Sequence, residues 1–147
     1  MGAALDHVRS YYESLNTADA GAVAAHFTDD AVHYYTRREP HVGAQAIAGN
    51  AALAVTHLNA RWTLEHAVEG DGEVVIEWSM AFDNPHSGRR CLDRGAEFLR
   101  FRDGLICEVR AYYHGGVPDN LSGDLVGFDH GGHGQTVLDP TAERSTT

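Results

Sequence analysis

The first half of the chain has hydrophobic residues at the three- and four-residue spacing of amphipathic helices. One such stripe predicts a helix that ends near Asn16; its members are Leu5, Val8, Tyr11, Tyr12 and Leu15. Asp19, a favourable N-cap residue, begins a short alanine-rich helix through Phe27. A third stripe predicts a helix over residues 43–58.

After residue 60 the hydrophobic period changes to two, which is typical of strands. Residues 61–69 and 73–82 are expected to be strands joined at Asp71-Gly72, a dipeptide that adopts the positive φ values of a hairpin turn. Residues 31–36 are expected to form an earlier strand, and residues 37–42, with Pro40, a loop. This order predicts an α+β fold in which a curved sheet covers the apolar faces of the helices.

Residues 93–114 are predicted to form a second hairpin, folded on Asp103-Gly104. With a two-residue loop, Glu97 lies opposite Arg110, and Asp93 lies opposite His114. The same face then carries Gly95, Leu99, Phe101, Ile106 and Tyr112. Ionisable groups beside apolar ones indicate a pocket wall rather than a solvated surface.

The 147 residues predict one domain over 1–114, followed by a glycine-rich extended arm over 115–140. We expect the arm to pack on its own domain or on a partner subunit, and residues 141–147 to form a disordered tail. The two cysteines, Cys91 and Cys107, are expected to be reduced thiols. The histidines are scattered without the spacing of a metal site, so no metal is expected.

The net charge of −10, from 11 basic and 21 acidic residues, disfavours a nucleic-acid partner, because a phosphate backbone would be repelled. No apolar run approaches the ~20 residues that cross a bilayer, so no membrane association is expected. Asp6 and His7 lie where a signal peptide would have its apolar region. A cytoplasmic location is the expectation.

Four segments combine turn, cap and strand residues in a recognisable pattern. They are Tyr11-x-x-x-Leu15-Asn16-x-x-Asp19, Phe27-Thr28-Asp29-Asp30-Ala31, Gly43-x-x-Ala46-Ile47 and Arg94-Gly95-x-Glu97-Phe98-x-Arg100-Phe101-x-Asp103-Gly104-x-Ile106. With these segments the chain resembles the nuclear transport factor 2-like superfamily, and within it the SnoaL-like polyketide cyclases and ketosteroid isomerases. The resemblance covers about residues 4–114. It implies a cone-shaped α+β barrel, with three N-terminal helices packed in a curved, mainly antiparallel sheet, that serves many different chemistries.

The resemblance also implies roles for individual residues. Tyr11 stands where ketosteroid isomerases place their oxyanion-hole tyrosine, and Glu97 where they place the protonated aspartic acid beside it. Tyr35 stands where those enzymes carry their aspartate base, and a phenol with a pKa near ~10 does not replace that base at neutral pH. SnoaL-like cyclases match better, because their acid/base aspartate falls at or near Glu97.

The residues themselves support related roles. Glu97 on an apolar wall suits a general acid or base, whereas an ion pair with Arg110 would lower its pKa. Tyr11 and Tyr35 are candidate donors to a developing oxyanion. Asp93 and His114 form a candidate carboxylate–imidazole pair or a solvated pair at the sheet end. The candidate substrate-binding residues are Trp78, Tyr112, Arg110, Leu99 and Phe101.

The expected function is a cofactor-independent cyclase or isomerase that acts by acid–base catalysis on a hydrophobic, carbonyl-bearing, polyketide-like intermediate. Epoxide hydrolysis, or epoxide-opening cyclisation by Asp93, Glu97 and Arg110, is an alternative. A non-catalytic ligand-binding or dimeric assembly module is another. A homodimer is expected through the outer sheet face, which would carry Phe98, Arg100, Cys107, Val109, Ala111 and Tyr113.

Overall fold

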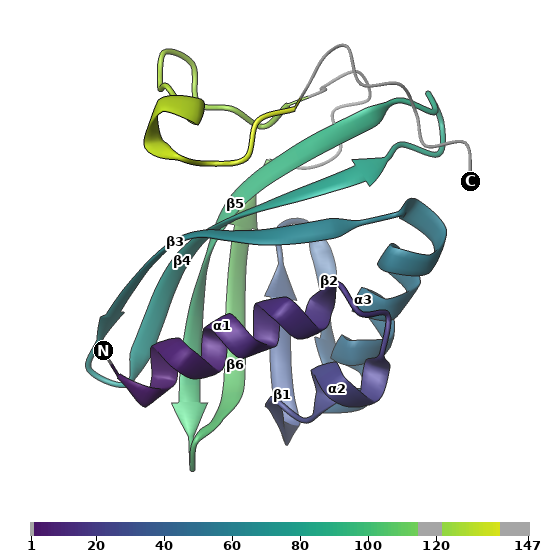
Figure 1. Cartoon of the computed structure of the whole chain (residues 1–147). Coiled ribbons are helices and arrows are strands. Elements are labelled where there is room, and N and C mark those ends of the chain that lie inside the picture. The colour runs from purple at the N-terminus through teal and green to yellow at the C-terminus, as the bar shows by residue number, and fades with distance from the viewer. Residues whose placement is uncertain (1, 115–121, 139–147) are drawn as a thin grey trace.

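Three helices lie on one face of a curved six-stranded sheet in the computed structural model, which describes residues 2–114 and 122–138 (Figure 1). The helices are α1 (Ala3–Leu15), α2 (Ala20–Ala24) and α3 (Ala44–Leu58). The strands are β1 (Phe27–Tyr35), β2 (Arg38–Val42), β3 (Arg61–Gly70), β4 (Glu73–Asp83), β5 (Arg90–Arg102) and β6 (Leu105–Tyr113). Their order is β2-β1-β6-β5-β4-β3; β1 and β6 are parallel, and the other neighbouring strands are antiparallel. The predicted α+β class is confirmed.

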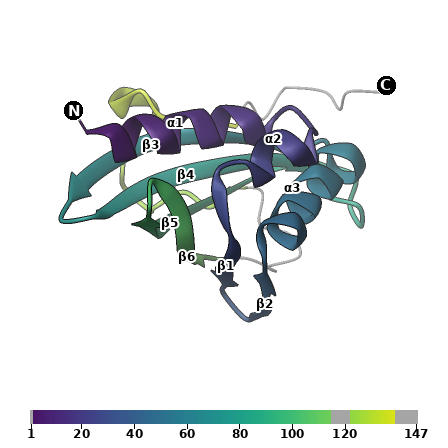
Figure 2. The ribbon, with the colours of Figure 1, turned by 90° about the horizontal axis from the view of Figure 1, so that it is seen from below.

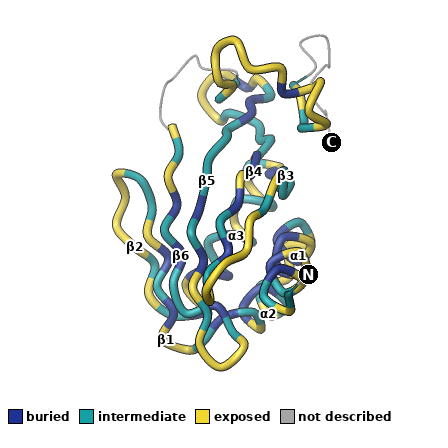
Figure 3. Tube along the Cα trace, turned by 90° about the vertical axis from the view of Figure 1, so that its left-hand side faces the viewer, coloured by how far each residue is buried: buried dark blue, intermediate teal, exposed yellow. Residues whose placement is uncertain are grey.

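The core lies between the helices and the concave face of the sheet (Figure 2). Val8 of α1 and Ile47 of α3 belong to the same buried cluster as apolar residues of the central strands. Figure 3 shows the buried stretches of α1, β5 and β6 in dark blue. The sheet supplies Val74, Ile76, Leu99, Ile106 and Val109, each at most 1% exposed. Each such side chain contributes roughly 1.5–3 kcal/mol when it leaves water. This burial holds the concave face in a fixed shape around the site.

Both predicted hairpin turns are present, but the second hairpin contains a β-bulge. Asp103 and Gly104 have φ values of 52° and 79°, as a two-residue turn requires. Phe101 pairs with Ile106, yet Arg100 already pairs with Glu108, so Cys107 is an extra residue. The predicted register beyond the bulge is therefore wrong by one residue.

The shift exchanges the two faces of β6, because neighbouring side chains along a strand point to opposite sides. Glu97 pairs with Ala111 rather than Arg110, and Gly95 pairs with Tyr113 rather than Tyr112. The exposed Tyr112 and the half-buried Arg110 lie on the outer face.

The predicted composition of the outer face changes with the register. Val109, Ala111 and Tyr113 face inward, against the prediction that they line the outside. Outside, the rings of Phe98 and Tyr112 meet edge to face, with centroids 6.1 Å apart. A homodimer through this face stays a prediction.

Residues 38–42 form an edge strand, β2, rather than the predicted loop. Pro40 is compatible with it because β2 pairs with β1 on one side and is open on the other. The preceding strand, β1, begins at Phe27 and so is longer than the predicted 31–36. These changes matter because β2 brings Arg38 to the cavity described below.

The described part of the arm, residues 122–138, packs against the chain's own sheet. The backbone N–H of Gly123 donates to the carbonyl of Leu92 at 2.7 Å. Arg94, which points away from the helices, binds Asp124 at 2.6 Å and the carbonyl of Thr136. The remainder of the predicted arm and the predicted tail over 141–147 lie outside the described residues.

Two further sequence expectations concern chemistry and location. Cys91 and Cys107 are free thiols, as expected. Within residues 2–114 and 122–138, no helix has the length and apolarity needed to cross a bilayer.

Candidate functional site

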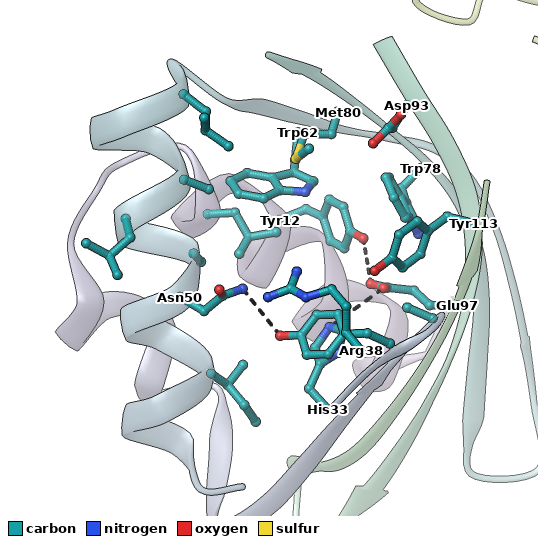
Figure 4. Close-up of a pocket in the computed structure, with 18 of the residues that line it drawn as sticks. Tyr12, His33, Arg38, Asn50, Trp62, Trp78, Met80, Asp93, Glu97 and Tyr113 are labelled. Atoms are coloured by element: carbon teal, nitrogen blue, oxygen red, sulfur yellow. Dashed lines mark hydrogen bonds and ion pairs between the residues drawn. The ribbon is translucent and has the colours of Figure 1, made fainter. Parts of the chain in front are cut away.

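A cavity of about 410 Å³ lies between α1, α3 and the concave face of the sheet (Figure 4). Most of its wall is apolar, with Leu15, Ile47, Leu58, Trp62 and Met80 among the lining residues. Its polar and aromatic lining includes Tyr11, Tyr12, His33, Tyr35, Arg38, Asn50, Trp78, Asp93, Glu97 and Tyr113. No residue of the described segment 122–138 lines it. A few polar groups in an apolar cavity of this size are typical of a small-molecule site.

Glu97 is the buried carboxyl group of this cavity. Its side chain extends from β5 toward α1, and the residue is 3% exposed. The hydroxyl of Tyr12 donates to Oε1 of Glu97 at 2.5 Å. Burial raises the pKa of Glu97 from 4.5 to about 7, although the Tyr12 hydrogen bond acts in the opposite direction. At neutral pH this carboxyl can therefore both accept and release a proton.

The ion pair between Glu97 and Arg110, the alternative to a catalytic Glu97, does not form in the described residues. The bulge turns Arg110 to the outer face, where its guanidinium contacts Glu108 at 3.2 Å and Glu73 at 3.5 Å. On the cavity side, Nε2 of His33 lies 4.0 Å from Oε2 of Glu97. Burial lowers the pKa of His33 to about 3, so this imidazole is neutral and leaves the Glu97 charge uncompensated.

Tyr12 is the contact of Glu97 that sequence reasoning missed, because the sequence places it only in the hydrophobic stripe of α1. Tyr11 lines the same cavity, and its ring meets those of Tyr12 and Phe27 edge to face at 5.3 Å and 5.1 Å. Burial raises the pKa of both tyrosines well above its ordinary value, so both remain hydrogen-bond donors. A buried phenol needs a partner, which was the available signal for Tyr12.

Tyr35 also lies in the cavity wall, at the end of β1. Its ring stacks on His33 with centroids 4.2 Å apart. Its hydroxyl is 3.0 Å from Nδ1 of His41, and the amide of Asn50 donates to it at 3.4 Å. Burial raises the pKa of Tyr35 above its ordinary value, so this phenol is a donor and not a base at neutral pH.

Asp93 is a second carboxyl group in the cavity wall. Burial raises its pKa from 3.8 to about 6, while the charge of His114 opposes this shift. Of the two alternatives for Asp93 and His114, the hydrogen-bonded pair is not found among the described residues: His114 lies exposed beyond the end of β6. His114 is not among the residues that line the cavity.

Trp78 has a buried indole N–H with no hydrogen-bond partner in the described part of the chain. Its ring lies against Gly95: a Cβ at Gly95 would be 2.6 Å from Cζ2 of Trp78 and 2.7 Å from the carbonyl oxygen of Tyr112. Glycine thus permits the close approach that fixes the indole orientation. Because buried N–H groups are normally paired, this unpartnered donor in the cavity wall is a candidate contact for a ligand.

Four predicted lining residues do not reach the cavity. Arg110 and Tyr112 point outward for the reason given above. Leu99 is fully buried in the core, and Phe101 packs beside His7 with ring centroids 5.6 Å apart. These two share the concave face with Glu97 but lie farther along the hairpin toward its turn, where core side chains fill the space.

Metal binding has no support from side-chain geometry in the part of the chain that is described. No three His, Cys, Asp or Glu side chains within it are grouped closely enough to hold a metal ion.

A family model described as a SnoaL-like domain matches residues 8–109. No curated protein matches the chain. A solved protein of unknown function with a cystatin-like fold, from Methylobium petroleophilum PM1, is 31% identical, with 96% of this chain and 95% of that chain covered and a TM-score of 0.68.

Two solved structures with named activities share the fold at lower identity. One is a protein from Xanthomonas campestris pv. campestris that is described as a proposed polyketide cyclase. It is 23% identical over 76% of this chain and 90% of that chain, with a TM-score of 0.63. The other is SalBIII, named as an epoxide hydrolase/cyclase-like enzyme in pyran ring formation; it is 18% identical over the same shares, with a TM-score of 0.65.

Proposed function

Because the chain belongs to the SnoaL-like domain family, we propose that it is a cofactor-independent cyclase or isomerase. It acts by acid–base catalysis on a hydrophobic, carbonyl-bearing, polyketide-like intermediate. The observation that carries this proposal is Glu97, a carboxyl group buried in an apolar cavity with a pKa near 7. A general acid or base is most effective when its pKa lies near the working pH.

In the proposed reaction, the Glu97 carboxylate takes a proton from the carbon next to a substrate carbonyl. The C–H electron pair moves into the new C=C bond, and the carbonyl oxygen becomes an enolate. The N–H of Trp78 and the O–H of Tyr35 donate to this oxygen, and the Tyr12 hydroxyl orients the carboxylate.

The proton then returns from the Glu97 carboxylic acid. In a cyclisation, the enolate carbon attacks a second carbonyl of the same molecule, a C–C bond forms, and the resulting alkoxide receives the proton. In an isomerisation, the proton returns to a different carbon. Either sequence conserves all atoms and electrons of the substrate, so no redox cofactor is consumed.

Epoxide opening is a second candidate, and Asp93 is the observation that favours it. Two carboxyl groups in one cavity, with pKa values of about 6 and about 7, can act as acid and base on the same substrate. Arg110, once expected in this cluster, faces away from the cavity.

Proton abstraction can be tested without the cognate substrate. A panel of aromatic 1,3-dicarbonyl compounds would be incubated with the protein in deuterated buffer, and NMR would follow the exchange of the acidic C–H. The proposal predicts protein-catalysed exchange for members that fit the cavity. Exchange at the buffer rate for every member that binds would contradict it.

Replacing Trp78 by Phe tests the role of the indole N–H. The variant keeps an aromatic ring on Gly95 but removes the donor, so the exchange rate of bound probe should fall about tenfold to a hundredfold with little change in probe affinity. Trp62→Phe is the matched control, because it removes the same atoms from another part of the cavity wall. Equal rates for the two variants would exclude a specific role for Trp78.

A further inference from the structure

Arg38 is a cation in the wall of the cavity that the proposed reaction does not use. It begins the edge strand β2, pairs with Tyr35 of β1 and is itself exposed. Figure 4 shows its side chain directed into the cavity near Asn50. An exposed residue that also lines the cavity stands where the cavity opens to solvent.

The guanidinium of Arg38 is held by an aromatic ring rather than by a carboxylate. Its central carbon lies 4.9 Å from the centroid of the Tyr35 ring, within the range of a cation–π interaction. No carboxylate of the described residues forms an ion pair with it, including Glu97 and Asp93 of the same cavity. The N–H donors of its planar fork are therefore available to a ligand.

The guanidinium of Arg38, unpaired among the described residues, favours a ligand with negatively charged oxygen atoms. A guanidinium fork matches a carboxylate in geometry, with two parallel N–H···O hydrogen bonds. The chain as a whole carries a net charge of −10, which disfavours anionic ligands. A local cation at the cavity opening allows this protein to bind an anionic ligand despite its net negative charge.

We propose that Arg38 binds a free carboxylate of the substrate, so that the substrate class is a hydrophobic carbonyl compound that is also an acid. This inference rests on the proposed function for the reaction itself. The apolar wall holds the body of the molecule, and Arg38 holds its charged end at the opening. Arg38 is thus a specificity-determining residue and takes no part in the proton transfer.

Calorimetric titration with 2-naphthoate and its neutral carboxamide tests this proposal, because neither probe undergoes the reaction. The wild-type protein should bind the acid about tenfold more tightly than the amide, the difference expected from one charge-assisted contact. Arg38→Gln should remove this preference and leave the amide affinity unchanged. Unchanged amide affinity also shows that the variant has folded around an intact cavity.

Arg37→Gln is the matched control, since it removes the same charge from a neighbouring residue that does not line the cavity. It should keep the preference for the acid. Equal binding of both probes by the wild-type protein, a retained preference in Arg38→Gln or a lost one in Arg37→Gln would each overturn the proposal. A variant Glu97→Gln that exchanges normally would refute the proposed reaction but leave this binding result standing.

Discussion

Replacing Glu97 by Gln is expected to lower the catalysed exchange rate by a factor on the order of 10³, the size of effect that general acid–base catalysis supplies. The amide keeps the shape of the side chain and can still accept from Tyr12, but it cannot take a proton. In the wild-type protein the rate should rise with pH through about 7, because the carboxylate form grows there. Exchange measured by NMR across pH tests both statements.

The control for this substitution is Glu77→Gln, the same chemical change at an exposed residue of β4. It should leave the rate and its pH dependence unchanged. If Glu97→Gln is folded and exchanges as fast as the wild-type protein, Glu97 is not the proton-transfer group.

Replacing Arg94 by Met is expected to cost roughly 3–5 kcal/mol of unfolding free energy, because it leaves a buried carboxylate without its counterion. The side chains of Arg94 and Glu65 are 8% and 3% exposed, and their charged atoms are 3.7 Å apart. Thr136 of the arm donates to Glu65 at 2.6 Å and 2.9 Å, so the pair also connects the arm to the sheet. Urea denaturation would give the free energy, and amide exchange over 122–138 would report loosening of the arm.

Arg102→Met is the comparison for this stability effect. Arg102 binds Asp30 at the surface, where the two side chains are 52% and 70% exposed, and solvent screens such pairs so that they contribute little to stability. If the Arg94 and Arg102 variants lose equal stability, the buried pair does not anchor the arm in the way described.

The helices and most strands follow from residue spacing, whereas the placement of β6 side chains does not. The Asp103-Gly104 dipeptide is a strong sequence signal for a turn, but nothing in the sequence around Cys107 indicates that this residue is the extra one of a β-bulge. One inserted residue exchanges the faces of every later position in the strand. Arg110 and Tyr112 were therefore assigned to the wrong side, while Glu97, on the continuous strand β5, was placed correctly on the concave wall.

Tyr12 and Arg38 show a different limit of sequence reasoning. Tyr11 and Tyr12 both belong to the buried stripe of α1, and only the packing of α1 on the sheet decides which hydroxyl meets Glu97. Arg38 lies in a short polar segment with Pro40, which has the composition of a loop, and its edge-strand conformation comes from pairing with β1. The Tyr12 contact joins segments 85 positions apart in the sequence, and the position of Arg38 depends on the pairing of β2 with β1. Neither can be predicted from local composition.

The protonation of Glu97 is the central claim, and NMR of protein labelled with ¹³C at the glutamate carboxyl carbons tests it most directly. The Glu97 signal would be identified by its absence in Glu97→Gln. We predict that it titrates with a pKa of about 7. A midpoint near the ordinary value of 4.5 would contradict the account, because the carboxyl group would then be a weak base that is fully ionised at neutral pH.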